Sequence, residues 1–195
     1  FTILGSDTLH LLTGQQLRND ADYVGQIAPE LGPYPLASGT SFPWAMGTTF
    51  SSLASSAQGL VAKQLGWLFG LAADYRNETR SHGNLMGNGV NGFRGAVYPE
   101  LYPTEDARLS WADALRLNVH PFFNAEQSRS SDSVPLVTVD GVGDVTPDEG
   151  RLRVHFSAAD EDGLAVALLW RYGQTIGEMP LSGTQVEADF LTPYY

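Results

Sequence analysis

Lys63 and Trp67 lie four positions apart, and their types and spacing suggest a specific contact. In a helix, positions i and i+4 share a face, so the ammonium group of Lys63 could lie over the indole ring of Trp67. Such a contact contributes about 0.5 to 2 kcal/mol, depending on burial. Both groups donate hydrogen bonds, and the amide of Gln64 between them takes up no proton near neutral pH. The pattern predicts packing or binding and not acid–base chemistry.

Other groups that could do chemistry give weaker patterns. Asp160 and Asp162 flank Glu161 before Gly163 and could supply oxygen ligands for Ca²⁺. The segment lacks the spacing of a helix-loop-helix calcium site, and Asp and Gly also favour turns. The four histidines are not spaced like ligand pairs, and the Gly-x-Ser-x-Gly motif of serine hydrolases is absent.

A helix over residues 50–72 must position the Lys63–Trp67 pair. Its apolar residues recur at steps of three and four, which predicts one apolar face. Gly66 and Gly70 lie inside this helix, where glycine often marks the close approach of another segment. Residues 73–104 read as a long connection in which GNGVNGFRG is irregular backbone. A second helix follows Ser110 and ends at Pro121.

The pattern changes after residues 124–133, NAEQSRSSDS, which are predicted to be a linker. Beyond this segment, PLVTVDGV, RLRVHFSA, LAVALLWRYG and TQVEADFL read as strands separated by turns. His155 is expected to point outward from its alternating strand. Strands at this spacing suggest an immunoglobulin-like sandwich, although only four or five are present where seven are usual.

Composition limits the function classes. The chain has 195 residues, 22 acidic against 11 basic side chains, and a formal net charge of −11. This charge disfavours nucleic acid as a partner. The chain has no cysteine, which excludes disulfides and thiolate metal sites. No apolar run approaches the roughly 18 residues that a membrane span needs.

Residues 60–122 resemble zinc peptidases of the metzincin type in three segments that occur in the same order. The family's active helix reads His-Glu-x-x-His-x-x-Gly-x-x-His/Asp, and KQLGWLFGLAA resembles it at the apolar and glycine positions. Asn84-Leu85-Met86-Gly87 resembles the methionine turn, which forms the floor of the family's site. RLSWADALRLNVHPFF resembles the family's closing helix.

The resemblance implies an α+β fold with two domains. Residues 1–123 would be a partial metzincin-like domain, with too few residues before Lys63 for the sheet that usually precedes the active helix. Residues 124–133 would be the linker. Residues 134–195 would be an incomplete antiparallel immunoglobulin-like β-sandwich.

The positions that carry the family's chemistry hold other residues here. Lys63, Trp67 and Ala73 stand at the zinc-ligand positions, and Gln64 stands at the position of the catalytic glutamate. A lysine ammonium repels a divalent cation, and neither an indole N–H nor a methyl group can ligate one. We therefore predict no intact catalytic residue and no bound metal or other cofactor, with Met86 the retained residue of the turn.

The predicted function is that of a catalytically inactive, metallopeptidase-like protein with a binding or structural role. We expect it outside the cell or at its surface, in an assembly with a protein partner. One alternative is an active zinc endopeptidase, with zinc as cofactor, if residues 63, 64, 67 and 73 are wrongly assigned or the ligands come from elsewhere. A second is a structural or carbohydrate-facing module without peptidase ancestry.

Overall fold

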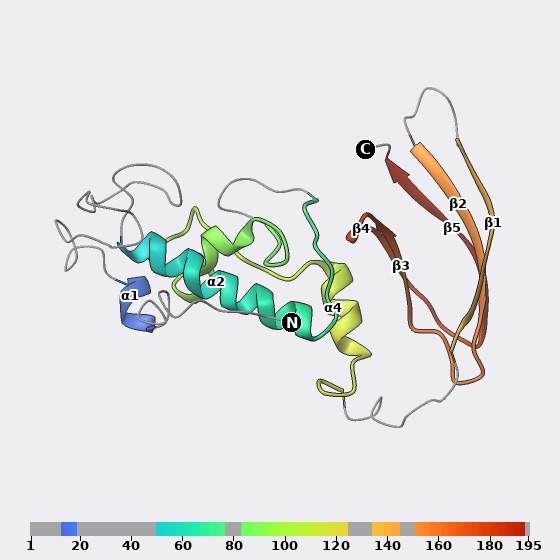
Figure 1. Cartoon of the computed structure of the whole chain (residues 1–195), viewed down its shortest axis with the longest axis horizontal. Coiled ribbons are helices and arrows are strands. Elements are labelled where there is room, and N and C mark those ends of the chain that lie inside the picture. The colour runs from blue at the N-terminus through green and yellow to red at the C-terminus, as the bar shows by residue number, and fades with distance from the viewer. Residues whose placement is uncertain (1–12, 19–49, 77–82, 125–133, 145–150, 194–195) are drawn as a thin grey trace. The chain divides into compact units, whose positions relative to one another are not determined.

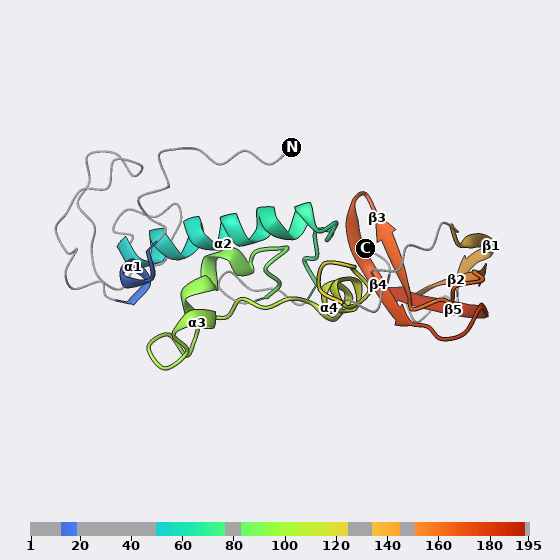
Figure 2. The same cartoon turned by 90° about the horizontal axis from the view of Figure 1, so that it is seen from below.

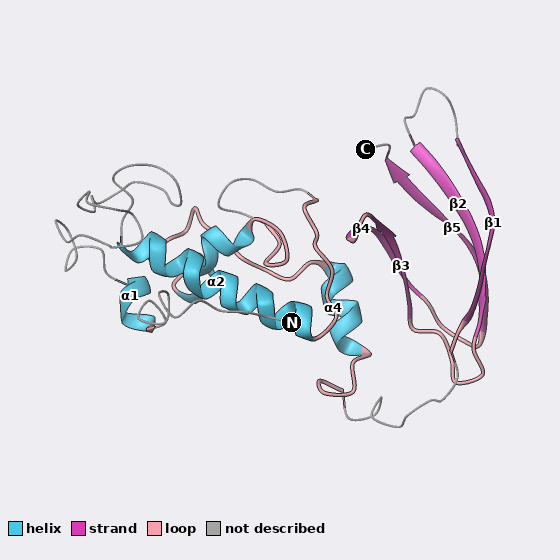
Figure 3. Cartoon of the chain, in the orientation of Figure 1, coloured by secondary structure: helices cyan, strands magenta, loops and turns pink. Residues whose placement is uncertain are grey.

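The computed structural model describes residues 13–18, 50–76, 83–124, 134–144 and 151–193. The chain divides into two compact units, Phe1–Ser110 and Trp111–Tyr195, and each is described by itself. Helices come first and five antiparallel strands in two small sheets follow, so the predicted α+β class is confirmed (Figures 1 and 3). Within the described residues, no helix combines the length and apolarity needed to cross a bilayer.

Helix α2, Phe50–Leu68, is the longest helix among the described residues of the first unit, and the short helix α1, Gly14–Arg18, packs against it. The predicted apolar face of α2 is buried at Leu53 and Ala54 but exposed at Leu60, Leu65 and Leu68. The deeply buried face instead carries small and polar residues, namely Ser51, Ser52, Ser55, Ser56, Gly59, Lys63 and Gly66. Small side chains let neighbouring backbone approach closely, and this outweighs the apolar pattern.

The end of α2 differs from the sequence prediction. The helix stops at Leu68 and not at residue 72, because Gly70 adopts a left-handed φ of 77°. The amide of Leu71 donates to the Gly66 carbonyl at 3.0 Å, and the amide of Gly70 donates to the Trp67 carbonyl at 3.0 Å. These two bonds form a Schellman motif, which reverses the chain direction directly after the helix.

The glycine-rich segment GNGVNGFRG is not irregular, as the sequence suggested. It forms a 3₁₀ helix, η4 (Gly89–Gly92), followed by the short helix α3 (Phe93–Val97). This pair lies along α2, as Figure 2 shows. A Cβ atom at Gly59 would collide with the backbone of Val90, so the glycine on α2 permits this close approach.

The second unit begins with α4, Trp111–Asn118, close to the predicted second helix. The strands are β1 (Leu136–Asp144), β2 (Arg151–Ala159), β3 (Val166–Arg171), β4 (Gln174–Pro180) and β5 (Gln185–Pro193). One sheet has the order β1-β2-β5 and the other pairs β3 with β4, all antiparallel. The four predicted runs correspond to β1, β2, β3 and β5, whereas β4 was missed.

The two sheets share one apolar core. Val154, Phe156, Ala158 and Phe190 are its buried residues, and Leu169 and Met179 from the β3–β4 sheet pack against them. Phe156 and Phe190 stack with ring centroids 5.3 Å apart. The alternation of RLRVHFSA therefore predicted the core face of β2 correctly, and His155 points to the opposite face as expected.

The predicted domain boundaries stay a prediction. Helix α4, which the sequence placed in the first domain, belongs to the second compact unit together with the strands. Within that unit, the guanidinium carbon of Arg116 on α4 lies 5.6 Å from the centroid of the Trp170 ring on β3. Most of the predicted linker, residues 125–133, lies outside the described residues and stays a prediction.

Candidate functional site

The site begins with Lys63, which α2 holds on its buried face. The side chain is 8% exposed, and its Nζ donates a hydrogen bond to the Gly87 carbonyl at 2.9 Å. The same nitrogen lies 5.7 Å from the ring centroid of Trp67 and 5.3 Å from that of Tyr75. The contact with Trp67 is the one that the four-residue spacing predicted. The contact with Tyr75 was not predicted, because it needs the chain reversal at Gly70.

The turn Asn84–Gly87 closes the site from the other side. Met86 is fully buried, and a Cβ atom at Gly66 of α2 would collide with its sulfur. The turn is fixed in place because the Leu85 amide donates to the Arg108 carbonyl at 2.7 Å. The resemblance implies that this turn forms the floor of the site, and the turn contacts α2 at Gly66 and Lys63.

Asp74 anchors the segment that carries Tyr75. Its carboxylate is fully buried, and Arg76 donates to it from both Nε and Nη2, at 2.9 and 2.6 Å. Burial alone would raise the pKa of Asp74, but the hydrogen bonds and charge of Arg76, helped by Ser110, hold it below its ordinary value. The Asn84 amide donates to the Asp74 carbonyl at 3.1 Å, which links this segment to the turn.

The remaining predicted positions have less defined roles. Gln64 is partly buried on α2, and Ala73 is partly buried directly before Asp74. Asp160 and Asp162, the weak calcium candidates, lie in the turn between β2 and β3. The Asp162 amide donates to the Asp160 carboxylate at 2.9 Å, as in an Asx turn.

The groups around Lys63 limit what the site can do chemically. Among the described residues, the Gly87 carbonyl, the indole of Trp67 and the phenol of Tyr75 surround the Lys63 ammonium, and none of these three groups is a carboxylate or an imidazole that could act as a general base. Among the residues that the structure describes, no group of three or more His, Asp or Glu side chains could hold one metal ion. The arrangement holds a buried cation in place between a helix and a turn.

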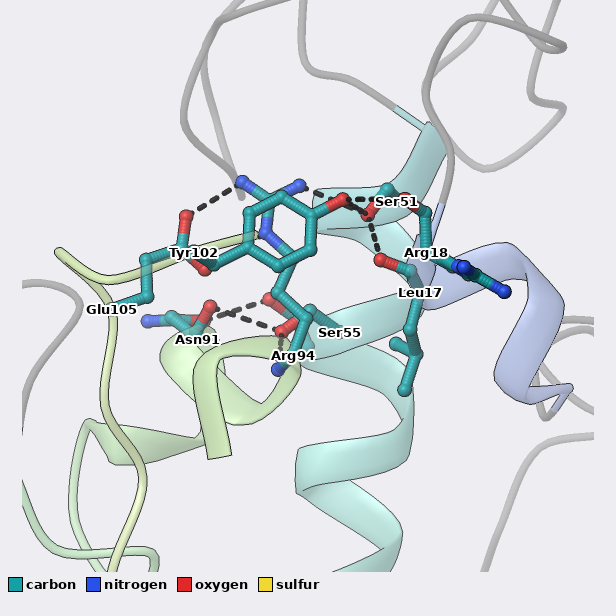
Figure 4. A network of polar contacts seen from close by, with 9 residues as sticks. Leu17, Arg18, Ser51, Ser55, Asn91, Arg94, Tyr102 and Glu105 are labelled. Atoms are coloured by element: carbon teal, nitrogen blue, oxygen red, sulfur yellow. Dashed lines mark hydrogen bonds and ion pairs between the residues drawn. The ribbon is translucent and has the colours of Figure 1, made fainter. Parts of the chain in front are cut away.

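Figure 4 shows a second polar cluster, which the sequence did not reveal, near the start of α2. Arg94 is 7% exposed and pairs with the Glu105 carboxylate through two bonds of 2.6 and 2.8 Å. Arg94 Nη1 also donates to Ser51 Oγ at 3.1 Å, and its guanidinium lies 4.2 Å from the centroid of the Tyr102 ring. Ser51 in turn donates to the Leu17 carbonyl at 2.8 Å.

The hydrogen bonds of this cluster hold several elements of the first unit together. Ser55 Oγ accepts from the Arg94 amide at 2.9 Å, and Ser56 Oγ donates to Asn91 Oδ1 at 3.0 Å, so η4 and α3 are held against α2. Local spacing gave no sign of the pair, because Arg94 and Glu105 belong to different segments and only the fold brings them together.

A cluster of titratable side chains lies on the outer face of the β1-β2-β5 sheet. The register places His155 opposite Asp189, whose carboxylate lies 2.7 Å from His155 Nδ1. Glu187 lies 3.3 Å from Nε2. The hydrogen bond to Asp189 and the charges of both acids raise the pKa of His155 above its ordinary 6.5. The sequence could not reveal this cluster, because it depends on the strand register.

Comparison of the chain with models of known protein families, with characterised proteins and with solved structures found no match.

Proposed function

We propose that this chain is a catalytically silent protein of metallopeptidase ancestry, whose first unit is a metzincin-like scaffold with a binding or structural role. The second unit would be an incomplete immunoglobulin-like sandwich. The observation that carries the proposal is the bond from Lys63 Nζ to the Gly87 carbonyl at 2.9 Å. In the family that the sequence resembles, the metal lies between the active helix and the methionine turn. Here a protein cation joins the two corresponding segments.

The chemistry around Lys63 supports this reading. Zinc peptidases polarise a metal-bound water, which needs ligands with lone pairs and a carboxylate to take a proton. The groups at positions 63, 64, 67 and 73 are an ammonium, an amide, an indole and a methyl group. A fixed positive charge also opposes a divalent cation at short range. The packing of Met86 on Gly66 would then be retained for the stability of the scaffold.

The proposed role is association with a protein partner in an extracellular or cell-surface assembly. The exposed apolar residues of α2, Leu60, Leu65 and Leu68, are consistent with a scaffold that presents a surface. The net charge of −11 favours a partner other than nucleic acid.

Zinc analysis of the purified full chain tests the proposal. The chain is incubated with excess zinc and dialysed, and the metal is measured by elemental analysis. We expect far less than one zinc per chain. Stoichiometric zinc in the unmodified chain would overturn the proposal and favour an active peptidase. Peptide mass spectrometry of α2 would then show whether positions 63, 64, 67 and 73 are correctly assigned.

A restored ligand set tests the ancestry separately. The variant Lys63→His/Gln64→Glu/Trp67→His/Ala73→Asp is expected to bind about one zinc per chain, as a site with three protein ligands does. The matched control keeps Trp67 and changes only the other three positions, and it should bind zinc much more weakly. If the restored variant keeps its far-UV circular dichroism and binds no more zinc than this control, the module has no metallopeptidase ancestry.

A further inference from the structure

The tip of the β3–β4 hairpin carries aromatic and basic side chains that are exposed. Trp170 is 46% exposed and Tyr172 is 91% exposed. Arg171 lies between them and is also exposed, and its guanidinium carbon lies 5.3 Å from the centroid of the Tyr172 ring. Residues 169–177 include no acidic side chain. Tryptophan, tyrosine and arginine are the residue types that most often dominate the binding energy of protein interfaces.

The turn at this tip holds a residue that its backbone disfavours. Tyr172 and Gly173 have positive φ and join β3 to β4 directly, as the central residues of a type I′ turn do. Asparagine, aspartate and glycine are preferred at the first of these positions. A left-handed conformation is strained for an aromatic residue, and burial does not offset the strain, because the ring is almost fully exposed. Tyr172 therefore lowers the stability of the hairpin.

Arg116 of α4 lies beside the same hairpin. Its guanidinium carbon lies 5.6 Å from the centroid of the Trp170 ring. The Arg116 side chain is partly buried, and its Nε atom is buried without a hydrogen-bond partner among the described residues. A buried donor without an acceptor is unfavourable for the isolated chain. A guanidinium that packing has already stripped of part of its water loses less hydration when it binds a carboxylate.

We propose that Arg116, Trp170, Arg171 and Tyr172 form a docking surface for an acidic segment of a protein partner. Charge complementarity selects this occupant, because the surface combines two guanidinium groups with a hairpin tip that has no acid. Guanidinium groups bind carboxylates through two parallel hydrogen bonds, and exposed rings can cover the apolar stems of glutamate side chains.

The net charge of −11 repels such a partner at long range. At physiological ionic strength this repulsion is screened beyond about 8 Å, so contacts with the surface itself decide the binding. The same net charge disfavours unspecific binding of an acidic peptide elsewhere on the chain, which makes such a peptide a selective probe. The inference concerns the second unit and does not rest on the ancestry of the first.

Stability measurements separate a role in binding from a role in the fold. Arg116→Met keeps an apolar stem beside Trp170 and removes the unpaired Nε donor. Tyr172→Asn places a preferred residue in the type I′ turn. Both variants should keep or raise the urea midpoint of the full chain, as is common where a residue is retained for function at the expense of stability. A midpoint lowered by either variant would show that the side chain serves the fold and would overturn the proposal.

Binding is measured by titrating the ¹⁵N-labelled full chain with N-acetyl-hexaglutamate amide. The side-chain Nε–H NMR signal of Arg116, assigned by its loss in Arg116→Met, should shift progressively. N-acetyl-hexaglutamine amide should leave the signal unchanged. Arg116→Met and Tyr172→Asn should each weaken binding of hexaglutamate about threefold, followed through the backbone amide of Gly173. Arg153→Met is the matched control, because Arg153 is 52% exposed on β2 of the same unit and its loss should leave the affinity unchanged.

Three outcomes would contradict the docking surface. The first is an Arg116 signal that several millimolar hexaglutamate does not move. The second is an equal loss of affinity from Arg153→Met and Arg116→Met, since the peptide would then follow charge alone. The third is a larger shift with inorganic phosphate than with hexaglutamate at the same concentration, because the surface would then select a small anion over a protein segment.

Discussion

Lys63 keeps a buried charge beneath two rings that are each about half exposed, Trp67 at 46% and Tyr75 at 44%. The rings shield the ammonium from solvent and offer it the negative faces of their π systems. The Gly87 carbonyl accepts a hydrogen bond from one of the three N–H groups of the ammonium. The stability of this arrangement should therefore depend on the rings as well as on the hydrogen bond.

A double-mutant cycle measures the contact between Lys63 and Trp67. Lys63→Met, Trp67→Leu and the double variant are unfolded in urea, and the coupling free energy is expected to be about 0.5 to 2 kcal/mol. Leu68→Ala replaces Trp67→Leu in the control cycle, because Leu68 neighbours Trp67 and is 63% exposed. Coupling to Trp67 no larger than coupling to Leu68 would show that the ring contact adds nothing.

His155 gives a prediction for pH dependence. Its pKa should exceed 6.5 in a histidine NMR titration, chiefly because of the hydrogen bond to Asp189, and Asp189→Asn should lower it. A raised pKa in the folded state adds stability below the pKa of the unfolded chain. That stability is lost as the pH rises through the folded value. Asp189→Asn should therefore reduce the melting temperature more at about pH 6 than at about pH 8.

Glu187→Gln is the control for this titration. Glu187 is 76% exposed and its bond to His155 is longer, so its removal should shift the pKa less than Asp189→Asn does. A larger shift from Glu187→Gln would show that the shorter bond is not the main cause.

At the scale of elements, glycine on the buried face of α2 sets how closely other segments approach. An alanine in a helix normally stabilises it by up to about 1 kcal/mol relative to glycine. At Gly59 the new methyl group would collide with the backbone of Val90, which cannot move without shifting η4. We expect Gly59→Ala to lower the free energy of unfolding by about 1 to 3 kcal/mol.

Gly66→Ala is the comparison for that variant. Its methyl group would meet the Met86 side chain, which has rotatable bonds and can shift. Gly66→Ala should therefore lower the free energy of unfolding by less than Gly59→Ala does, as measured by urea unfolding of both variants. A gain of stability at Gly59 would show that η4 does not pack on α2 as described.

The Arg94–Glu105 pair connects α3 with the segment that follows it. Arg94→Met leaves the Glu105 carboxylate, which is 17% exposed, without its main partner. Breaking a buried pair from one side costs roughly 3 to 5 kcal/mol. Arg108→Met is the matched control, since Arg108 is 70% exposed and its bond to Asp106 is 3.2 Å long. The control should change the free energy of unfolding by less than about 1 kcal/mol.

At the scale of the whole molecule, periodicity was a good guide to the strands. The alternation in RLRVHFSA predicted β2, its core residues and the outward position of His155. It gave no information about β4, QTIGEMP, because a glycine and two isolated apolar residues do not make a period-two pattern. The type of each long element could thus be read from the sequence, whereas the shorter partner strand could not.

Only the part of the site formed by residues close together in the sequence could be predicted. The Lys63–Trp67 contact follows from helical spacing alone. Tyr75 and Gly87 reach Lys63 only after the chain reverses at Gly70 and returns through the Asn84–Gly87 turn. The apolar periodicity of α2 even indicated the wrong buried face toward its C-terminal end. Serine and glycine contribute little to hydrophobic patterns, although they allow the closest packing.

The β3–β4 hairpin has a further consequence for the order in which the second unit folds. Tyr172 and Gly173, with φ values of 51° and 78°, join these strands directly, so their pairing closes a very short loop. Arg151 and Pro193 pair in the β2–β5 ladder, and the whole β3–β4 hairpin lies between them in the sequence. Local pairings form faster than distant ones, so β3–β4 should appear before β2–β5. In pulse-labelled hydrogen exchange, Leu168 and Glu178 should gain protection earlier than His155 and Asp189, and simultaneous protection would refute this sequence of events.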